Sequence, residues 1–388
     1  MVTLTSAENA LKTLYLGVVS DQLNTNVNPL LAKIAQTTSD VWGKEIRKLA
    51  PFGINGGVGA GSEDGNLPAA ASNNYAQFVL TLKNLYGTIE ISDKAIRASQ
   101  NNAGAFVNLL EAEMEGLIKA SKFNFGRMLF GDGSGILAKV TAFTPNVVTV
   151  DNTQNFIEGM MVDVIRASAD TAVLFSRRVL DVDRENSTIT LGGNNITANL
   201  ISVGDYICVQ GSYHKELTGL GAIFGDSETL YGLTRAENKW MTPYRATSTT
   251  ISDVVLQKAI DTLDEVAGSA ADFIVCSAGV KRAYQDYLVT NRCNVDVMNL
   301  QGGYKAISYN GIPVVSDKFA PKGTIYVLNT SEFHLHQLCD WRWLEGDNGK
   351  VIRQSINRPI YTATLVKYAD MICDKPRGQA MISGITEA

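Results

Sequence analysis

The side chains best suited to chemistry in this sequence are few and far apart. His334 and His336 alternate, and Cys339 follows closely. In a strand, this alternation places both histidines on one face, where they could bind a metal ion. Because the rest of a ligand set is missing, we favour a packed or solvated strand face and expect no metal and no other cofactor.

Patterns for nucleophilic or phosphate chemistry are also incomplete. His214 has no serine or cysteine in a recognisable elbow nearby, so a catalytic triad is not supported. The glycine-rich runs 56–61 and 219–225 match neither a P-loop nor a dinucleotide fingerprint. The run 181–186 begins like a calcium loop but lacks its central glycine and closing glutamate. We therefore expect no catalytic residue and a protein that is not an enzyme.

Composition narrows the class of protein further. Hydrophobic residues make up 45% of the 388 residues and charged residues 19%, which is typical of a globular chain with about two or three folding units. The net charge of −5 disfavours nucleic-acid binding through a basic face. No run of about 18 apolar residues exists and no signal-peptide pattern opens the chain, so no membrane partner is expected. The five cysteines are widely spaced, as in reduced thiols of a cytosolic compartment.

The first ninety residues predict an arm and a hairpin with a long loop. Helical spacing of apolar residues predicts that the arm has one apolar face, which needs a partner to cover it. Alternation at 42–52 and 75–92 predicts strands, and the aperiodic stretch between them indicates a loop that is disordered or ordered by a neighbouring chain. Glu63 and Asp64 at the tip of the loop would pair with a basic residue of a neighbouring chain or be merely solvated. The residues predicted to contact another subunit are Leu11, Leu14, Tyr15 and Val18 in the arm, and Gly56, Gly57, Gly59, Gly61, Glu63, Asp64 and Leu67 in the loop.

Three further segments follow. A 3–4 spacing of apolar residues over 102–130 predicts a helix of roughly 40 Å, ended by a glycine-rich turn. Short strands between turn residues over 139–216 predict an inserted β-barrel or sandwich. From 252 onward helices and strands alternate, with one strand predicted over 307–315 and Pro313 marking its edge or end.

In this order the elements resemble the major capsid proteins of tailed bacteriophages with the HK97-type fold. The resemblance is carried by the arm, the hairpin that returns through 85–96, and the long helix that leaves through Phe-Gly-Asp-Gly-Ser-Gly at 130–135. It implies an α+β fold with an N-arm, an extended-loop (E-loop) hairpin, a spine helix, axial and peripheral domains, and an inserted small all-β domain. The implied divisions are 1–41 (arm), 42–92 (extended loop), 93–138 (peripheral domain with spine helix), 139–216 (inserted domain), 217–344 (axial domain) and 345–388 (peripheral return strands).

The resemblance also implies a function. The protein would self-assemble through hexamers and pentamers into the icosahedral shell of the virion, in the cytoplasm of the bacterial host, and enclose double-stranded DNA without reading its sequence. If this sequence is the full gene product, the lack of a long charged helical segment ahead of the arm implies a separate scaffolding protein, and a portal and a decoration protein would be further partners. The alternatives are an encapsulin-like nanocompartment shell, another phage structural protein of the tail or baseplate, and an enzyme built on the α/β segment 240–344.

Overall fold

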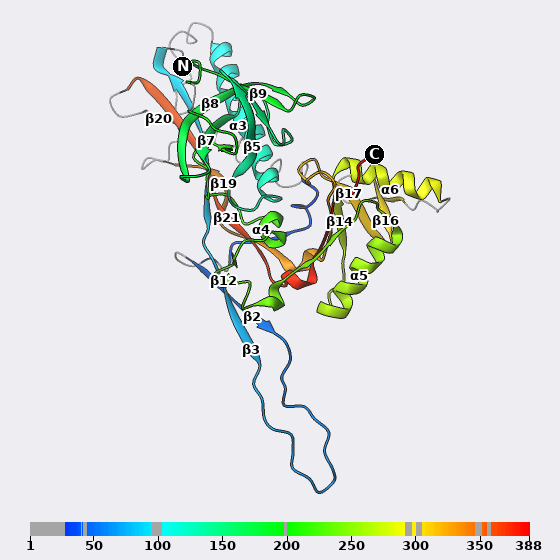
Figure 1. Ribbon diagram of the computed structural model, residues 1–388. Helices are drawn as coiled ribbons and strands as arrows, with labels where there is room; N and C mark the ends of the chain where they lie inside the picture. The colour runs from blue at the N-terminus through cyan, green and yellow to red at the C-terminus, as the bar shows by residue number, and fades with distance from the viewer. Residues whose placement is uncertain are drawn as a thin grey trace.

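In the computed structural model, the described part of the chain forms two main sheets, a closed barrel and a hairpin that projects away from them (Figure 1). No described helix is long and apolar enough to cross a membrane. The described residues are 28–39, 41, 45–94, 103–197, 200–291, 297–299, 305–345, 351–354 and 358–388.

A five-stranded sheet carries the long helix predicted from the sequence. That helix, α3 (Ala103–Met128), has 26 residues and is therefore about 39 Å long. It buries Met114, Ile118 and Phe125 in the same core as the sheet, and Phe125 meets Trp341 edge-on at 6.2 Å between ring centroids. The strands of the sheet are β1 (Ala35–Thr37), β19 (Phe333–Trp343), β21 (Ile360–Cys373) and β20 (Arg353–Gln354) in that order, with β4 (Lys83–Ser92) also paired to β21.

The position of β4 corrects the predicted hairpin. We expected the hairpin to return through 85–96, but β4 pairs with β21 from Lys83↔Ala369 to Ser92↔Ile360. Leu85, Ile89 and Ile91 are thereby buried in the core that α3 also enters. The projecting hairpin consists only of β2 (Ile46–Phe52) and β3 (Asn74–Leu80).

A seven-stranded sheet is flanked by two amphipathic helices. The side chain of Ser252 caps α5 (Asp253–Ala267) by accepting a hydrogen bond from Val255 N, and Gly268 ends the helix at φ 55°. Its helices are α5 and α6 (Ala278–Thr290), and its strands in order are β13 (Tyr244–Thr247), β22 (Ala380–Ser383), β18 (Ile325–Leu328), β14 (Phe273–Cys276), β17 (Ile312–Ser316), β16 (Lys305–Tyr309) and β15 (Val297–Asn299).

The prediction of a single strand over 307–315 is wrong. The structure has two strands, β16 and β17, joined at Asn310 and Gly311 with φ of 48° and 78°. Positive φ at both central residues is the geometry of the tight turn that Asn-Gly favours in hairpins. Pro313 lies at the start of β17, before the ladder with β14 begins at Val314, so the predicted strand end is confirmed there.

Two assignments from the last third of the chain are also corrected. Residues 333–343 fall inside the predicted α/β segment 240–344, but as β19 they pair with β1 and β21 in the five-stranded sheet. The final residues were expected to return to the peripheral domain, but β22 lies between β13 and β18 in the seven-stranded sheet. Ala380 and Ile382 have no exposed area there. Strand β22 therefore completes the core that the seven-stranded sheet shares with α5 and α6.

The inserted all-β unit is confirmed as a closed barrel. Apolar side chains that alternate along its strands fill the interior, among them Val148, Val162, Val179 and Ile207, each without exposed area. The first strand, β5, was not expected. The strands in barrel order are β10 (Tyr206–Val209), β5 (Ile136–Thr144), β6 (Val147–Val150), β9 (Thr188–Leu191), β8 (Thr171–Asp183) and β7 (Met161–Arg166).

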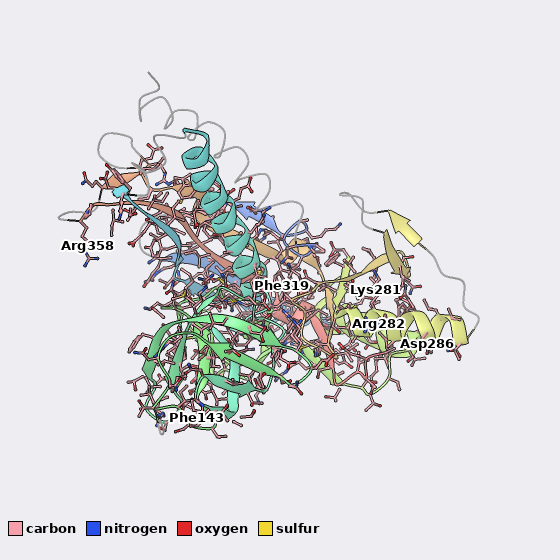
Figure 2. All side chains as sticks on the ribbon, turned by 90° about the horizontal axis from the view of Figure 1, so that it is seen from above. Phe143, Lys281, Arg282, Asp286, Phe319 and Arg358 are labelled. Carbon is pink, nitrogen blue, oxygen red and sulfur yellow. The ribbon has the colours of Figure 1, made fainter. Side chains whose placement is uncertain are left out.

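Buried polar contacts fix the barrel to the rest of the molecule. Arg127, in the last turn of α3, donates from Nη1 and Nη2 to the two oxygens of Glu216 at 2.8 and 2.6 Å. Two residues later, the backbone N of Thr218 donates to Asp370 Oδ1 at 2.7 Å. Figure 2 places Phe319 where α3, the barrel and the seven-stranded sheet meet, and its ring lies 5.1 Å from that of Phe123.

The chain leaving the barrel crosses the end of α3 at close range. A Cβ on Gly219 would lie 2.4–2.6 Å from backbone oxygens of Met128, Leu129 and Gly131, so only glycine fits. The short elements that follow are α4 (Leu220–Phe224), β11 (Thr229–Leu230), β12 (Leu233–Thr234) and the 3-10 turn η1 (Lys239–Met241), and the later 3-10 turns are η2 (Thr330–Glu332) and η3 (Pro376–Gly378).

Replacing Asp370 by Asn is expected to raise stability at neutral pH. Burial raises the pKa of this carboxyl from 3.8 to about 6, so the folded state binds more protons than the unfolded state between these values. Stability from this group is therefore greatest at low pH, falls as pH rises from about 4 to 6, and stays lower above. In urea titrations at pH 7.5, Asp370→Asn should gain up to roughly 3 kcal/mol in free energy of unfolding, and the gain should vanish near pH 4.

The matched control for this variant is Asp181→Asn, a change of the same type at an exposed barrel residue. It should alter the free energy of unfolding little at either pH. A loss of stability at pH 7.5 in Asp370→Asn would show that the ionised carboxylate holding Thr218 is the stable form, and would contradict the prediction.

Candidate assembly interface

The projecting hairpin has a regular stem and a long loop without strands. β2 and β3 pair without a register shift from Ile46↔Leu80 to Phe52↔Asn74. We call residues 53–73 the extended loop; they begin at Gly53, whose φ of 67° turns the chain out of β2. A two-stranded ribbon in water is marginal by itself, so this hairpin needs further contacts to be stable.

Glycines let the two limbs of the extended loop run close together. A Cβ on Gly57 would lie 3.2 Å from Ala71 N, and one on Gly59 would lie 3.2 Å from Pro68 Cγ. The backbone N of Gly57 also donates to Asn55 Oδ1 at 2.9 Å. Glycine is therefore needed at positions 57 and 59 because the two limbs approach each other closely there.

The extended loop exposes large apolar side chains. Ile54, Val58 and Leu67 are 86–90% exposed, and in the stem Leu49 and Tyr75 are 62% and 55% exposed. Side chains of this size gathered on one projecting element are typical of a surface that becomes buried in an assembly. Among the predicted loop residues, Glu63, Asp64 and Leu67 are exposed at or near the tip, where Gly65 N donates to Ser62 O at 3.2 Å.

Aromatic stacking and an ion pair hold the root of the hairpin. Phe52 stacks on Trp240 at 4.7 Å with 4° between the ring planes, and Phe78 lies 5.9 Å from the same ring. Lys48 Nζ lies 2.6 Å from Asp374 Oδ2. Beneath them Tyr231 is buried, desolvation raises its pKa well above 10, and its hydroxyl accepts a hydrogen bond from Cys373 N at 2.9 Å. The stem is therefore anchored while the loop is not.

Replacing Trp240 by Ala should loosen the hairpin without unfolding the barrel. The variant loses the stacking on Phe52 and Phe78, which we expect to cost about 3 kcal/mol locally. Hydrogen exchange at 46–52 and 74–80 should then accelerate by roughly a hundredfold, and exchange in the barrel should not change. Trp240→Phe is the control, since it keeps a ring over Phe52. Equal exchange in wild type and Trp240→Ala would show that the stem does not depend on this contact.

The arm residues Leu11, Leu14, Tyr15 and Val18 lie outside the described residues. The described end of the arm packs within its own chain: Leu30, Leu31 and Ile34 are buried in the core beneath α3. The side chain of Asn28 accepts from Leu30 N at 3.1 Å and orders this turn.

The candidate metal pattern of the sequence falls on strand β19 of the five-stranded sheet. His334 and His336 lie on β19, but the ladder shifts register between Gln337 and Cys339, so alternation does not extend to the cysteine. His334 Nε2 lies 3.1 Å from Asp374 Oδ2, at the root of the hairpin. Within the described ranges, no group of three or more His, Cys, Asp or Glu residues could hold a metal ion.

Sequence reasoning missed part of this surface. Ile54 and Val58 were not named individually, although large apolar residues inside a run of Gly, Ala, Ser and Asn are themselves a signal. Such a run cannot form a core of its own, so its apolar side chains have only another chain or solvent as neighbours.

The chain was compared with family models, curated proteins and solved structures. No family model and no curated protein matches the chain. The capsid of cyanophage A-1(L) is similar at a TM-score of 0.56 and 12% identity, over 95% of this chain and 93% of that one. The capsid of a native GTA particle (TM-score 0.48, 11% identity, 92% and 90% covered) and the SrpI encapsulin of Synechococcus elongatus PCC 7942 (TM-score 0.46, 9% identity, 92% and 88% covered) are more distant. The likeness to the cyanophage capsid shows that this chain has the HK97-type fold of phage capsid proteins.

Proposed function

We propose that this protein is the major capsid protein of a tailed bacteriophage and that copies of it form a closed icosahedral shell. The observation that carries the proposal is the projecting hairpin, whose extended loop exposes Ile54, Val58 and Leu67 almost fully. The HK97-type fold supports it, because the chain shares this fold with a phage capsid protein.

Interface residues follow from this proposal. Gly56, Gly57, Gly59, Gly61, Glu63, Asp64 and Leu67 would contact an adjacent subunit, and the anchored stem would aim them. Modest contacts of this kind, repeated over a closed shell, add to a stable particle.

We expect the arm residues Leu11, Leu14, Tyr15 and Val18 to become protected only after assembly, because their apolar face is then covered by a neighbour. Hydrogen exchange measured on unassembled subunits and on shells gives the comparison. The described arm residues Leu30 and Leu31 are the internal control, since they are buried already and should be protected in both states. Equal exchange over 10–18 before and after assembly would rule the arm out as an interface.

The finer parts of the proposal concern organisation and partners. We propose the division into arm, extended loop, peripheral, inserted and axial domains given above, adjusted for the strand pairings of β4, β19 and β22. The shell would hold double-stranded DNA as cargo without sequence-specific contacts, which a net charge of −5 favours. A scaffolding protein and a portal would act during assembly in the host cytoplasm, and a decoration protein could bind afterwards.

Electron microscopy of the protein expressed alone and with its neighbouring genes tests the proposal. We expect closed shells some tens of nanometres across when the assembly partners are present. Rings or tubes would instead support a tail or baseplate component, and shells loaded with an enzyme would support a nanocompartment. Monomers or dimers under every condition would refute a shell protein.

A further inference from the structure

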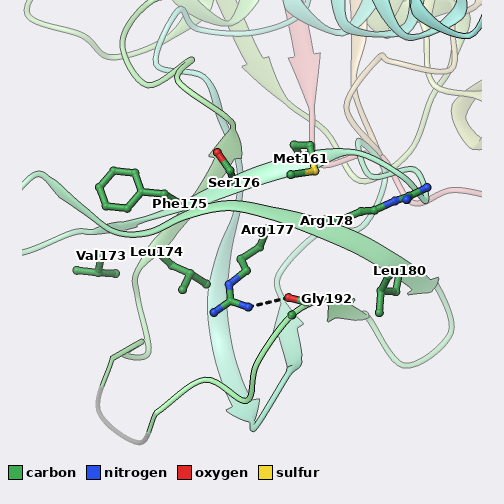
Figure 3. A pocket seen from close by; sticks show the side chains of 10 residues that line it. Met161, Val173, Leu174, Phe175, Ser176, Arg177, Arg178, Leu180 and Gly192 are labelled. Atoms are coloured by element: carbon green, nitrogen blue, oxygen red, sulfur yellow. Dashed lines mark hydrogen bonds between the residues drawn. The ribbon is translucent and has the colours of Figure 1, made fainter. Parts of the chain in front are cut away.

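An open groove of about 630 Å³ runs along the outside of the barrel beside strand β8 (Figure 3). Phe175 and Leu180, which line it, are 66% and 55% exposed. In Figure 3 the side chain of Arg177 lies between Leu174 and Leu180. Two large exposed apolar side chains in one groove indicate a surface that another segment covers.

The groove follows a strand edge that lacks a ladder partner among the described residues. β8 pairs with β7 through 171–178, but with β9 only through 179–183. On the β9 side the last backbone bond runs from Gly192 N to Arg178 O at 2.7 Å. Beyond it, Arg177 Nη1 donates to Gly192 O at 2.9 Å, which ties down the diverging chain.

Irregular backbone keeps this edge open. Ser176 has φ of 47°, and the β7–β8 ladder shifts register on both sides of Val164. Bulges bend a strand away from its neighbour and re-aim its side chains. An exposed edge of this kind can accept an extended segment as an added strand.

The charges in the groove select an acidic segment. Its lining residues include Arg177 and Arg178 and no carboxylate. Arg178 is exposed, whereas Arg177 is half-buried and already bonded to backbone oxygens. A ligand with one or two carboxylates next to an apolar side chain would match both features.

The extended loop of this chain has that chemistry. Its tip carries Glu63 and Asp64, followed by Leu67, which is 90% exposed, and residues 53–73 form no strand. In Figure 1 the tip of the hairpin and the barrel lie at opposite ends of the molecule. A loop that reaches the groove must therefore belong to another copy.

We propose that the groove beside β8 is the docking site for the extended-loop tip of a second copy of this chain. Leu67 packs against Phe175, Glu63 and Asp64 face Arg178, and the loop backbone adds to the open edge of β8. The inference rests on the proposed function and adds to it the surface that receives the loop. It makes the inserted barrel a part of the shell contact.

Photo-crosslinking in the full chain tests the contact. We would place p-benzoylphenylalanine at position 67, assemble a mixture of isotopically heavy and light subunits, irradiate, and identify the joined peptides by mass spectrometry. We expect position 67 to join residues 173–180, with heavy–light pairs in the product. The reciprocal probe at position 175 should join residues 62–68, and it covers the case in which the first probe hinders assembly.

Variants of the groove provide the matched comparison. Phe175→Ser with Arg178→Glu should lower the crosslink yield about tenfold. The control, Val203→Ser with Lys215→Glu, makes the same changes at exposed residues of the barrel outside the groove and should leave the yield unchanged. Arg178→Glu alone should also lower the yield, and adding Glu63→Arg and Asp64→Arg to it should restore most of that loss, because the charges are exchanged.

The outcomes separate this inference from the proposed function. Shells whose crosslinks avoid 173–180, or join it only to another protein, would overturn the docking site and leave the shell function standing. Crosslinks found only within one copy would overturn it as well. Failure to form any closed particle would overturn both.

Discussion

A variant in which an Asn-Gly turn replaces the extended loop, residues 53–73, should fold normally and form no closed shells. The turn joins Phe52 to Asn74, which are already paired, and Asn-Gly suits a tight hairpin. The loop contributes little to the core of its own chain, so the free energy of unfolding of unassembled subunits should change by less than about 1 kcal/mol. Size-exclusion chromatography and electron microscopy should show soluble subunits or small capsomers.

A second variant distinguishes loop length from loop chemistry. Ile54→Ser, Val58→Ser and Leu67→Ser together keep the length and remove three side chains that are 86–90% exposed. If these side chains become buried between subunits, this triple variant should assemble at a protein concentration raised by at least about a hundredfold. Normal shells from the loop-shortened variant would refute a role of the loop in assembly.

Helices and strands whose positions depend on local sequence patterns could be predicted from the sequence. Strands β6 and β14 lie in segments where the sequence predicts short strands, because turn residues flank short apolar runs at both sites. The helix α3 differs from its predicted range by one or two residues. The paired strands and the loop between them were also visible in the sequence, because periodicity stops at Phe52 and resumes near Asn74.

Pairing between distant segments could not be predicted in the same way. β4 and β21 lie far apart in the sequence, and no local pattern shows that Lys83 lies opposite Ala369. The same holds for β22, which joins a sheet that begins with β13. The turn at Asn310 and Gly311 is different, because Asn-Gly is a local signal and was overlooked between two apolar runs.

The sequence predicted one half of the candidate interface, the extended loop, and missed the other half, the groove beside β8. Glu63, Asp64 and Leu67 follow from the composition of the loop. Phe175 and Arg178 could not be found, because their exposure depends on the bulged backbone at Ser176 and on where β9 leaves the ladder. An apolar residue in a barrel strand is predicted to face the interior unless such an irregularity is known.

Replacing Glu216 by Leu should destabilise the unassembled protein by about 3–5 kcal/mol, the largest effect we expect from a single substitution. The side chains of Arg127 and Glu216 are only 4% and 3% exposed, and two hydrogen bonds join them. Removing the carboxylate leaves the guanidinium buried without its counter-charge. Urea titration followed by tryptophan fluorescence measures the loss, because Trp341 and Trp343 lie in the core beneath α3.

The double variant Arg127→Met with Glu216→Leu should recover most of this loss, because apolar side chains of similar size leave no charge in the core. The control is Arg47→Ser, which breaks a pair with Glu45 whose side chains are 60% and 35% exposed and should cost less than about 1 kcal/mol.

A small effect of Glu216→Leu would mean that water reaches Arg127 when its partner is removed. The junction would then be held by packing at Gly219 and Phe319 rather than by this pair, and the barrel could turn relative to α3 when the charge is lost. A large effect reversed by the double variant would show that the loss comes from one uncompensated charge buried where α3 meets the chain that leaves the barrel.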